Sequence, residues 1–373
     1  VLQLLVPLRF GGAERLALDI LRLGKDAFSG VMAGLFYPPD SLARAAEAQA
    51  LPWLAVRADQ GGRMRAVWRL SRLIRSERVS LVHAQAAYVL PYALPAARLA
   101  GIPIVYTEHA VHSLRTIAWL RNFVRLSAPW LQGISCVSEP IRAYFTDELG
   151  IAEHRVRCIP NGVDPDAFSP EGDPAPSPWT TLSGEYDVEG HGERPFIFGN
   201  VGRLCEAKDH ETLLRAFEKV RRARPEARLL LVGDGELRDA IASRIRELSL
   251  EPYVQVTGVR SDIPELLRGM DVFVLSSVRE GMPVALLEAM TCGLPCVSTD
   301  VGDVASLNRD EERLLLVPPS DPGALAQAML RMMERPSERS ALAERGMRHA
   351  RAACGSGKMV EEYLAMYRQG GMR

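Results

Sequence analysis

The segment VFVLSSVREGMPVALLEAM, residues 272–290, joins a short apolar run to a stretch with the spacing of a helix. VFVL is four residues long and entirely apolar, which is typical of a strand buried on both faces of a parallel sheet. Pro283 suits the first turn of the following helix, because its φ is fixed and the N–H it lacks would have no partner there. The segment therefore predicts a strand–loop–helix unit of an α/β protein.

The same unit recurs on both sides of this segment. In the first half the predicted strands are Val1–Val6, Pro52–Val56, Val79–His83, Pro103–Thr107 and Gly133–Val137. In the second half they are 196–201, 228–233, 254–257, 272–275, 295–298 and 314–317. Strands that alternate with helices indicate parallel sheets with right-handed crossovers. We therefore expect two doubly wound, Rossmann-like α/β domains that face each other across a cleft.

A proline-rich segment separates the two series. Residues 165–195 contain six prolines, four glycines, seven acidic residues and one basic residue, a composition typical of a linker. We predict an N-terminal domain at 1–165, a linker at 166–194 and a C-terminal domain at 195–355. The final helical stretch, about 356–373, follows the completed second series and is expected to cross back to the first domain.

Composition limits the classes of protein that the chain can belong to. No apolar run approaches the roughly 18 residues needed to span a bilayer, and the six cysteines lack zinc or redox spacing. Buried, reduced thiols favour the cytoplasm. Residues 1–165 carry 19 Lys and Arg against 13 Asp and Glu, whereas the remainder is acidic. We expect the first half to meet an anionic partner, but not nucleic acid, because the excess is small and no reader motif is present.

Ligands of doubly wound sheets bind at the carboxyl ends of the strands, where helix N-termini supply amides. Gly11 and Gly12 follow the first predicted strand, where they permit either close approach to a phosphate or a tight turn. Arg203 and Lys208 follow the first strand of the second series. Two cations at that place can neutralise a diphosphate without a metal, or they can simply be solvated.

The opening segment places two carboxylates after its strand. Glu280 lies in the loop and Glu288 inside the helix, while Gly281 and Met282 precede Pro283 and can present amides at the helix N-terminus. Such carboxylates can accept hydrogen bonds from sugar hydroxyls and from a ribose diol. Alternatively, Glu280 stabilises the helix dipole, which is worth ~0.3–1 kcal/mol, and Glu288 is a satisfied carboxylate on a partly buried face.

Three apparent motifs are rejected. Gly233-Asp234-Gly235 lacks the third glycine of a dinucleotide fingerprint, because Arg238 stands there, although a base-binding turn remains open. CGSGK, at 354–358, lacks the first glycine of a phosphate-binding P-loop. The DPD triplet at 164–166 falls beside the linker, where we expect a turn and not a metal site.

Two basic, aromatic stretches lie in the first half, at 63–78 and 112–131. In 63–78, helical spacing predicts one face with Arg65, Arg69 and Arg72 and another with Met64, Val67, Trp68 and Ile74. The stretch 112–131 interleaves arginines with Trp119, Phe123 and Trp130. Such stretches can bind an anionic membrane surface, or they can be ordinary outer helices packed on their sheet.

The ordered set of motifs resembles the retaining GT-B glycosyltransferases of family 4, which use sugar nucleotides. The matching segments are Gly11–Arg15, TEHAVHS at 107–113, VSE at 137–139, IPNGVD at 159–164, GRLCEAKDH at 202–210, VGDGELR at 232–238 and Glu280–Glu288. They span nearly the whole chain. The set carries the resemblance, because no single piece is specific.

The resemblance implies a role for each matched residue. Arg203 and Lys208 would hold the donor diphosphate and offset the charge of the departing nucleotide without a divalent ion. Glu280 would contact hydroxyls of the transferred sugar, and Glu288 would bind the donor ribose. Gly12 would lend its amide to the diphosphate.

Further matched residues would complete the donor site. His109 would lie beside the reacting sugar, although a structural histidine at a strand end is the competing interpretation. The turn at Gly233 and Gly235, together with Arg260 in the TGVRSDI loop at 257–263, would frame the base. Where relatives often have a second histidine after LVHA, this chain has Gln85, and nothing is carried over from the run at 302–306.

The resemblance implies a hexosyltransferase that retains anomeric configuration, needs no metal or other cofactor and uses a UDP- or GDP-linked donor. A saccharide or lipid-linked acceptor would place it in surface polysaccharide or glycolipid assembly, in the cytoplasm or peripherally at the inner face of the membrane. The alternatives are a sugar-nucleotide 2-epimerase, which shares the architecture but needs no acceptor, and a non-catalytic sugar-nucleotide-binding subunit. A glycosidase is disfavoured, because Glu280 and Glu288 as helical residues would lie ~12 Å apart along the axis.

Overall fold

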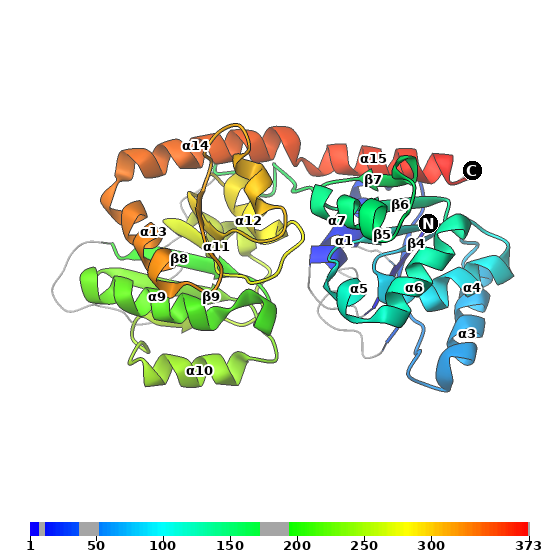
Figure 1. The fold of residues 1–373 in the computed structure, drawn as a ribbon, viewed down its shortest axis with the longest axis horizontal. Coiled ribbons are helices and arrows are strands. Elements are labelled where there is room, and N and C mark those ends of the chain that lie inside the picture. The colour runs from blue at the N-terminus through cyan, green and yellow to red at the C-terminus, as the bar shows by residue number, and fades with distance from the viewer. Residues whose placement is uncertain (7–11, 37–51, 172–193, 372–373) are drawn as a thin grey trace. The chain divides into compact units, whose positions relative to one another are not determined.

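The computed structural model describes residues 1–6, 12–36, 52–171 and 194–371. The chain forms two compact units (Figure 1). Unit 1 comprises Val1–Gly162 and Ser356–Arg373, and unit 2 comprises Val163–Gly355. The boundary after 162 lies close to the predicted end of the first domain at 165. Most of the predicted linker, 172–193, lies outside the described residues.

Unit 1 contains a seven-stranded parallel sheet in the order β3-β2-β1-β4-β5-β6-β7. Its strands are β1 (Leu2–Leu5), β2 (Val31–Gly34), β3 (Trp53–Ala55), β4 (Val82–Ala84), β5 (Ile104–Glu108), β6 (Gly133–Cys136) and β7 (Val156–Cys158). Its helices are α1 (Gly12–Leu23), α3 (Gly62–Ser76), α4 (Leu90–Ala100), α5 (His112–Thr116), α6 (Ala118–Ser127), α7 (Glu139–Ala143) and α15 (Ser356–Gln369). Short 3-10 or π turns are η1 (Ala87–Val89), η2 (Ala128–Trp130), η3 (Tyr144–Glu148) and η4 (Glu153–Arg155).

Five of these seven strands were predicted, and β2 and β7 were not. β2 has the sequence VMAG, in which alanine and glycine have low strand propensity. β7 is three residues long and carries Arg157 at its centre, so it has neither a continuous apolar run nor a full alternation. The strand predicted at Val79–His83 begins three residues later than expected, because β4 starts at Val82.

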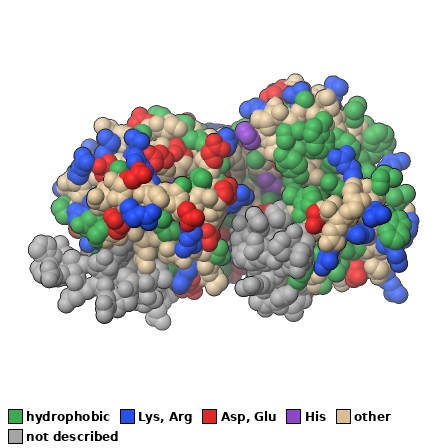
Figure 2. Space-filling view, turned by 90° about the horizontal axis from the view of Figure 1, so that it is seen from below, with side chains coloured by type: hydrophobic (Ala, Val, Ile, Leu, Met, Phe, Trp, Pro, Cys, Tyr) green, Lys and Arg blue, Asp and Glu red, His purple; other side chains and the backbone are tan. Residues whose placement is uncertain are grey.

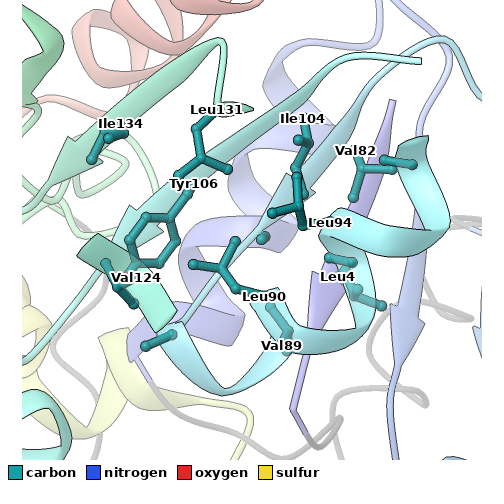
Figure 3. Packing of buried hydrophobic residues seen from close by; sticks show 14 of the residues in the cluster. Leu4, Val82, Val89, Leu90, Leu94, Ile104, Tyr106, Val124, Leu131 and Ile134 are labelled. Atoms are coloured by element: carbon teal, nitrogen blue, oxygen red, sulfur yellow. The ribbon is translucent and has the colours of Figure 1, made fainter. Parts of the chain in front are cut away.

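The main core of unit 1 fills the space between the sheet and the helices on one of its faces (Figure 3). Leu4, Val82 and Ile104 come from neighbouring strands and pack against Leu90 and Leu94. Each of these side chains is at most 5 % exposed. Burying a side chain of this size stabilises the fold by about 1.5–3 kcal/mol, so this face of the sheet is a major source of stability.

The second core of unit 1 depends on the last helix. Met359, Tyr363 and Tyr367 of α15 are buried against Leu16 and Ile20 of α1, and α15 also contacts β6. The packing is close, because a Cβ on Gly133 would lie 2.8 Å from Met366. The C-terminal segment is therefore part of the unit formed by residues 1–162.

Unit 2 contains a six-stranded parallel sheet in the order β10-β9-β8-β11-β12-β13. Its strands are β8 (Phe196–Val201), β9 (Ala227–Val232), β10 (Val254–Val256), β11 (Val272–Leu275), β12 (Cys296–Thr299) and β13 (Leu315–Val317). Its helices are α9 (His210–Ala223), α10 (Arg238–Glu247), α11 (Ile263–Arg268), α12 (Val284–Thr291), α13 (Pro322–Glu334) and α14 (Pro336–Ala353), with the 3-10 turns η5 (Glu206–Lys208) and η6 (Val304–Asn308). All six strands were predicted.

Both sheets confirm the predicted doubly wound α/β class. In each unit the first strand lies inside the sheet and the chain winds outward in both directions from it, the order typical of nucleotide-binding folds. The order reverses between β1 and β4 in unit 1 and between β8 and β11 in unit 2. These switch points are the places where the fold leaves a crevice at the carboxyl ends of the strands.

Candidate functional site

Most of the predicted site residues of unit 2 lie beside its switch point, in the loops after β8, β9 and β11. Lys208 ends η5 after β8, and Glu280 lies in the loop after β11. The Lys208 Nζ is 2.5 Å from Glu280 Oε1, and the two side chains are only 18 % and 12 % exposed. The structure thus brings together two residues that are 72 positions apart in the sequence.

The two oxygens of Glu280 have different surroundings. Oε1 accepts hydrogen bonds from Lys208 Nζ and from Ser277 Oγ, the latter at 2.6 Å. Oε2 has no hydrogen-bond partner among the residues that the structure describes. Lys208 Nζ carries three hydrogens and bonds only Glu280 within the same residues. The pair therefore retains one free carboxylate oxygen and two N–H donors for a ligand.

The loop after β11 is held by its neighbours. Thr299 Oγ1 donates to Ser277 O at 2.6 Å, and Ser276 Oγ donates to Lys208 O at 2.8 Å. Gly302 has φ +61° and lies so close that a Cβ would be 2.5 Å from the carbonyl oxygens of Glu280 and Gly281. The position of Glu280 is therefore fixed by β12 and the loop that follows it as well as by its own strand.

The helix after this loop starts one residue later than predicted. Pro283 is the N-cap, with ψ 113°, and α12 begins at Val284, so Pro283 is not in the first helical turn. Its extended ψ follows from its place outside the helix. Met282 and Glu288 are buried, at 8 % and 9 % exposure. Glu288 thus lies in the second turn of α12, as expected from its spacing.

Arg203 is paired with a different carboxylate from the one that Lys208 contacts. Its guanidinium makes a two-pronged contact with Glu236 in the loop after β9, with Arg203 Nη2 3.1 Å from Glu236 Oε1. The Arg203 side chain is 55 % exposed, and an exposed pair of this kind contributes little to stability. The guanidinium can therefore exchange Glu236 for an anionic ligand at small cost.

The loops after β8 and β9 approach each other at glycines. Gly233 has φ +143°, and a Cβ there would lie 1.9 Å from Gly202 O. At Gly235, a Cβ would lie 2.3 Å from Leu204 O. The GDG turn thus needs glycines because the backbones of two loops come into contact there.

Arg260, in the loop after β10, makes a paired contact with Asp262, with Arg260 Nε 2.8 Å from Asp262 Oδ1.

In unit 1, His109 follows β5 and lines a pocket of about 170 Å³. Ala13 and Glu14 of α1, together with Gln85 and Tyr88 after β4, form other parts of its wall. His109 Nε2 is 2.9 Å from Gln85 Oε1. Burial lowers the pKa of His109 to about 4, so that the imidazole is neutral at physiological pH.

Glu108 fixes the backbone beneath His109. Its Oε1 accepts from the N–H groups of His109 and Ala110 at 3.0 and 3.3 Å, and its Oε2 accepts from Tyr106 Oη and from Ala87 N–H. Burial raises the pKa of Glu108, and these hydrogen bonds oppose that effect. Sequence reasoning missed Glu108 and the partner role of Gln85. Polar residues at the ends of otherwise apolar strands were the available signal.

Gly12 is the first residue of α1 and directly precedes Ala13, which lines this pocket. Its neighbour Gly11 lies outside the described residues.

The DPD triplet forms a turn, as predicted, in which Asp164 Oδ1 accepts from the N–H groups of Asp166 and Ala167. Within the described ranges, no group of three or more His, Cys, Asp or Glu residues could hold a metal ion. All six cysteines are free thiols.

The predicted apolar face of the stretch 63–78 is wrong in part. Val67 and Ile74 are buried in the core, whereas Met64 and Trp68 are 85 % and 58 % exposed. A helix has 3.6 residues per turn, which separates the two pairs around the axis of α3. Trp68 instead stands with the arginines, since Arg72 lies 4.8 Å from its ring centroid.

The two basic stretches form one surface, which we call the Arg–Trp surface and define as the exposed residues of α3, α6 and η2 together with Arg98 of α4. Arg63 of α3 lies 5.7 Å from the Trp119 ring of α6, and Arg98 lies 5.8 Å from the Trp130 ring of η2. Figure 2 shows hydrophobic side chains gathered with Lys and Arg on the part of the molecule that carries unit 1. No helix in the described part of the chain is both long enough and apolar enough to cross a membrane.

In a comparison with known proteins, each unit matches a family model of glycosyltransferases. The family model Glycosyltransferase Family 4 matches residues 10–167, and the model Glycosyl transferases group 1 matches residues 195–335. The UDP-Gal:alpha-D-GlcNAc-diphosphoundecaprenol alpha-1,3-galactosyltransferase of Escherichia coli is 30 % identical over 285 residues, covering 73 % of this chain and 70 % of that protein. The putative glycosyltransferase EpsF of Bacillus subtilis is 32 % identical over 59 % of this chain and 57 % of its own length.

Solved structures agree on the fold. Anabaena Alr3699/HepE in complex with UDP and glucose has a TM-score of 0.85 at 20 % identity, covering 98 % of each chain. Sucrose-phosphate synthase from Thermosynechococcus elongatus has a TM-score of 0.79 at 18 % identity, covering 99 % of this chain and 98 % of that one. With two doubly wound sheets and these matches, the chain belongs to glycosyltransferase family 4 and has the GT-B fold.

Proposed function

We propose that this glycosyltransferase moves a hexosyl or N-acetylhexosaminyl unit from a UDP- or GDP-linked donor to an acceptor hydroxyl, with retention of anomeric configuration and without a metal ion. The acceptor is a saccharide or lipid-linked saccharide of surface polysaccharide or glycolipid assembly. The observation that carries the proposal is the Lys208–Glu280 pair at the switch point of unit 2. It combines a cation for a diphosphate with a carboxylate for sugar hydroxyls.

Each residue of unit 2 takes a role that its surroundings permit. Lys208 directs its two remaining N–H donors to the diphosphate, and Arg203 exchanges Glu236 for the same group. Glu280 Oε2 accepts from hydroxyls of the transferred sugar. Glu288 binds the ribose, and the backbone of Gly281, Met282 and Pro283 lines the same site. Gly233, Gly235 and Arg260 frame the base.

Two residues of unit 1 complete the proposal. Gly12 offers an amide at the N-terminus of α1, a position that favours an anion. His109 is a neutral imidazole that positions a hydroxyl of the reacting sugar. In this mechanism the bond from the anomeric carbon to the diphosphate oxygen breaks, and the acceptor oxygen bonds to the same face of that carbon. The departing phosphate takes the acceptor proton, while Lys208 and Arg203 offset the charge that develops on it.

The donors and acceptors of similar proteins support this choice of substrates. The Escherichia coli relative is named for a UDP-galactose donor and a diphosphoundecaprenol-linked acceptor, and Alr3699/HepE has been solved with UDP-glucose. For the present chain, UDP-sugars and undecaprenol-diphosphate-linked sugars are therefore the first substrates to test.

The decisive experiment measures binding and transfer in sequence. Melting-temperature shifts with UDP, GDP and ADP identify the base, and the sugars of that nucleotide are then incubated with lipid-linked acceptors in EDTA. We expect an upward shift, since a ligand at 100 times its Kd stabilises the protein by about 2.7 kcal/mol. We also expect an NMR spectrum of the product with the anomeric configuration of the donor sugar. An inverted product or a need for a divalent ion would contradict the mechanism.

An incubation of donor without acceptor separates the alternative functions. A change of the sugar itself identifies an epimerase. Binding of the nucleotide with no turnover on any acceptor identifies a binding subunit. Transfer that requires the acceptor excludes both alternatives.

We further propose that the Arg–Trp surface holds the protein against an anionic bilayer, at the inner face of the membrane, where lipid-linked acceptors are found. Trp68, Trp119 and Trp130 are each at least half exposed, and tryptophan prefers the boundary between water and lipid. Arg65 and Arg72 are exposed, and neither forms an ion pair with a carboxylate among the described residues. These arginines are thus available to lipid phosphates.

Vesicle flotation tests this surface. The protein is expected to float with anionic vesicles at low salt and not with zwitterionic ones. Arg65→Ala with Arg72→Ala should weaken binding by about 2 kcal/mol, roughly 30-fold, at about 1 kcal/mol for each basic residue. The matched control replaces Arg215 and Arg222, two exposed arginines of α9, and should bind as wild type. Equal binding of all three proteins, or none at low salt, would refute the proposal.

A further inference from the structure

A chain of buried polar side chains runs from the last helix of unit 1 to the pocket that His109 lines. Its members all have at most 1 % of their surface exposed, and they are Gln3, His83, Gln85, Thr107, Ser135 and Tyr367. Buried polar groups are retained only when they are hydrogen-bonded, so the order of donors and acceptors along this chain is constrained.

The amides of Gln3 and Gln85 set the direction of the chain. Gln3 Nε2 donates to Tyr367 Oη at 2.9 Å, which leaves Gln3 Oε1 as the acceptor from Gln85 Nε2 at 2.8 Å. The carbonyl oxygen of Gln85 therefore faces His109 Nε2 at 2.9 Å. An amide oxygen only accepts hydrogen bonds, so the proton of the neutral His109 ring is on Nε2.

His83 agrees with this direction. Gln85 Nε2 lies 3.2 Å from His83 Nδ1, which is also 2.6 Å from Tyr367 Oη. Both neighbours can donate, so Nδ1 is the unprotonated nitrogen and His83 Nε2 donates to Thr107 Oγ1 at 2.6 Å. Desolvation, with a smaller effect of His109, lowers the pKa of His83 to about 3, and the neutral ring is what these contacts require.

The remaining nitrogen of His109 is then an acceptor. His109 Nδ1 has no hydrogen-bond partner in the part of the chain that the structure describes, and His109 lines the pocket beside Glu14 and Ser113. A ring that presents a lone pair accepts a hydrogen bond from a hydroxyl. A ring in the other tautomer would present an N–H at this place. That N–H can donate to a hydroxyl oxygen but cannot accept the hydroxyl proton.

We propose that Gln85 is a positioning residue that fixes the ring and the Nε2–H tautomer of His109, so that Nδ1 accepts a hydrogen bond from a substrate hydroxyl. Tyr367 connects this network to the C-terminal helix, because its hydroxyl accepts from Gln3 Nε2 and the oxygen of the same amide accepts from Gln85 Nε2. The contact with the substrate rests on the proposed function, whereas the tautomer is a property of the protein alone. Glu108 holds the backbone of His109 separately, so a change at Gln85 alters the ring and leaves the loop in place.

The direct test is the nitrogen NMR spectrum of the ligand-free protein labelled with 15N histidine. The chain has seven histidines, and the His109 signals are assigned by their loss in His109→Asn. The expected result is a neutral ring with the proton on Nε2 for His109 and for His83. A proton on Nδ1 of His109 requires both amides to be reversed and overturns the proposal. Because no substrate is present, this result does not depend on whether the protein transfers sugars.

Variants extend the test to turnover. Gln85→Leu removes the acceptor and is expected to lower kcat about 10–100-fold with little change in donor affinity, since small misplacements of a reacting group cost rates of this size. Gln85→Glu keeps an acceptor oxygen against His109 and should recover part of the loss. The matched control is Gln255→Leu, a glutamine of the parallel strand β10 in unit 2, which should behave as wild type.

The outcomes distinguish the two proposals. An Nε2–H ring with no transferase activity preserves the positioning role and refutes the function. Active enzyme with an Nδ1–H ring supports the function and refutes the positioning role. Wild-type kcat and an unchanged His109 spectrum in folded Gln85→Leu refute the positioning role, and if Gln85→Leu does not fold, the wild-type spectrum and Gln85→Glu still decide the question.

Discussion

Glu280→Ala is expected to lower kcat about 10²–10³-fold while nucleotide binding persists. The substitution removes the oxygen that accepts from Lys208 and the second oxygen that the proposal assigns to the sugar. Lys208 is then a largely buried cation without its partner, and the nucleotide diphosphate can supply the missing negative charge. The loss should therefore appear in turnover. Steady-state kinetics and melting-temperature shifts with the free nucleotide measure the two effects separately.

The control for Glu280 is an acidic residue whose ion pair lies on the surface. Glu334→Ala breaks the exposed contact with Arg224, which contributes little, and should leave both kcat and binding unchanged. Lys208→Ala should lower nucleotide affinity as well as kcat, because it removes a cation from the diphosphate. Turnover of Glu280→Ala at the wild-type rate would eliminate Glu280 from the mechanism.

Gly233→Ala is expected to have the largest effect on stability. The backbone at Gly233 has φ +143°, a value that residues other than glycine rarely adopt, and the new Cβ would lie 1.9 Å from Gly202 O. Strain and overpacking together should cost about 3 kcal/mol. For a unit of this size the melting temperature should fall by roughly 6–12 °C. Calorimetry should show the change in the transition of unit 2.

The matched control is Gly357→Ala near the start of α15. No heavy atom lies within 4 Å of the added Cβ, and alanine favours a helix over glycine by at most about 1 kcal/mol. This variant should be as stable as wild type or slightly more stable. A Gly233→Ala protein that melts with wild type and binds nucleotide normally would show that the loops after β8 and β9 do not need their close approach.

The positions of Glu280 and Glu288 in the secondary structure could be predicted from the local sequence. VFVL, Pro283 and the helical spacing after it placed Glu280 in a loop and Glu288 in a helix, and the structure has both there. These features are local, since strand and helix periodicities act over a few residues. Pro283 lies one position outside the helix, because an extended ψ at the N-cap is as compatible with proline as the first turn is.

The short strands β2 and β7 mark the limit of the same reasoning. β2 contains alanine and glycine, which have low strand propensity, and β7 has an arginine at its centre. Each is formed by pairing with a strand outside its local sequence. The exposed position of Trp68 is a similar case. The apolar residues of α3 cover too wide an arc for all of them to reach the core, and only the packing of the helix on its sheet decides which do.

The sequence by itself determined two strand–helix series, their parallel α/β class and the order of motifs that identifies a family 4 glycosyltransferase, because these depend on periodicity and on residue types at fixed spacing. Only the tertiary structure decided which distant residues meet. Lys208 contacts Glu280, and Gln85 links His109 through Gln3 to Tyr367, 258 positions after His109. The first contact arises where loops converge at the carboxyl ends of parallel strands, and the second where the last helix packs on the sheet of unit 1. No local pattern encodes which of these segments meet.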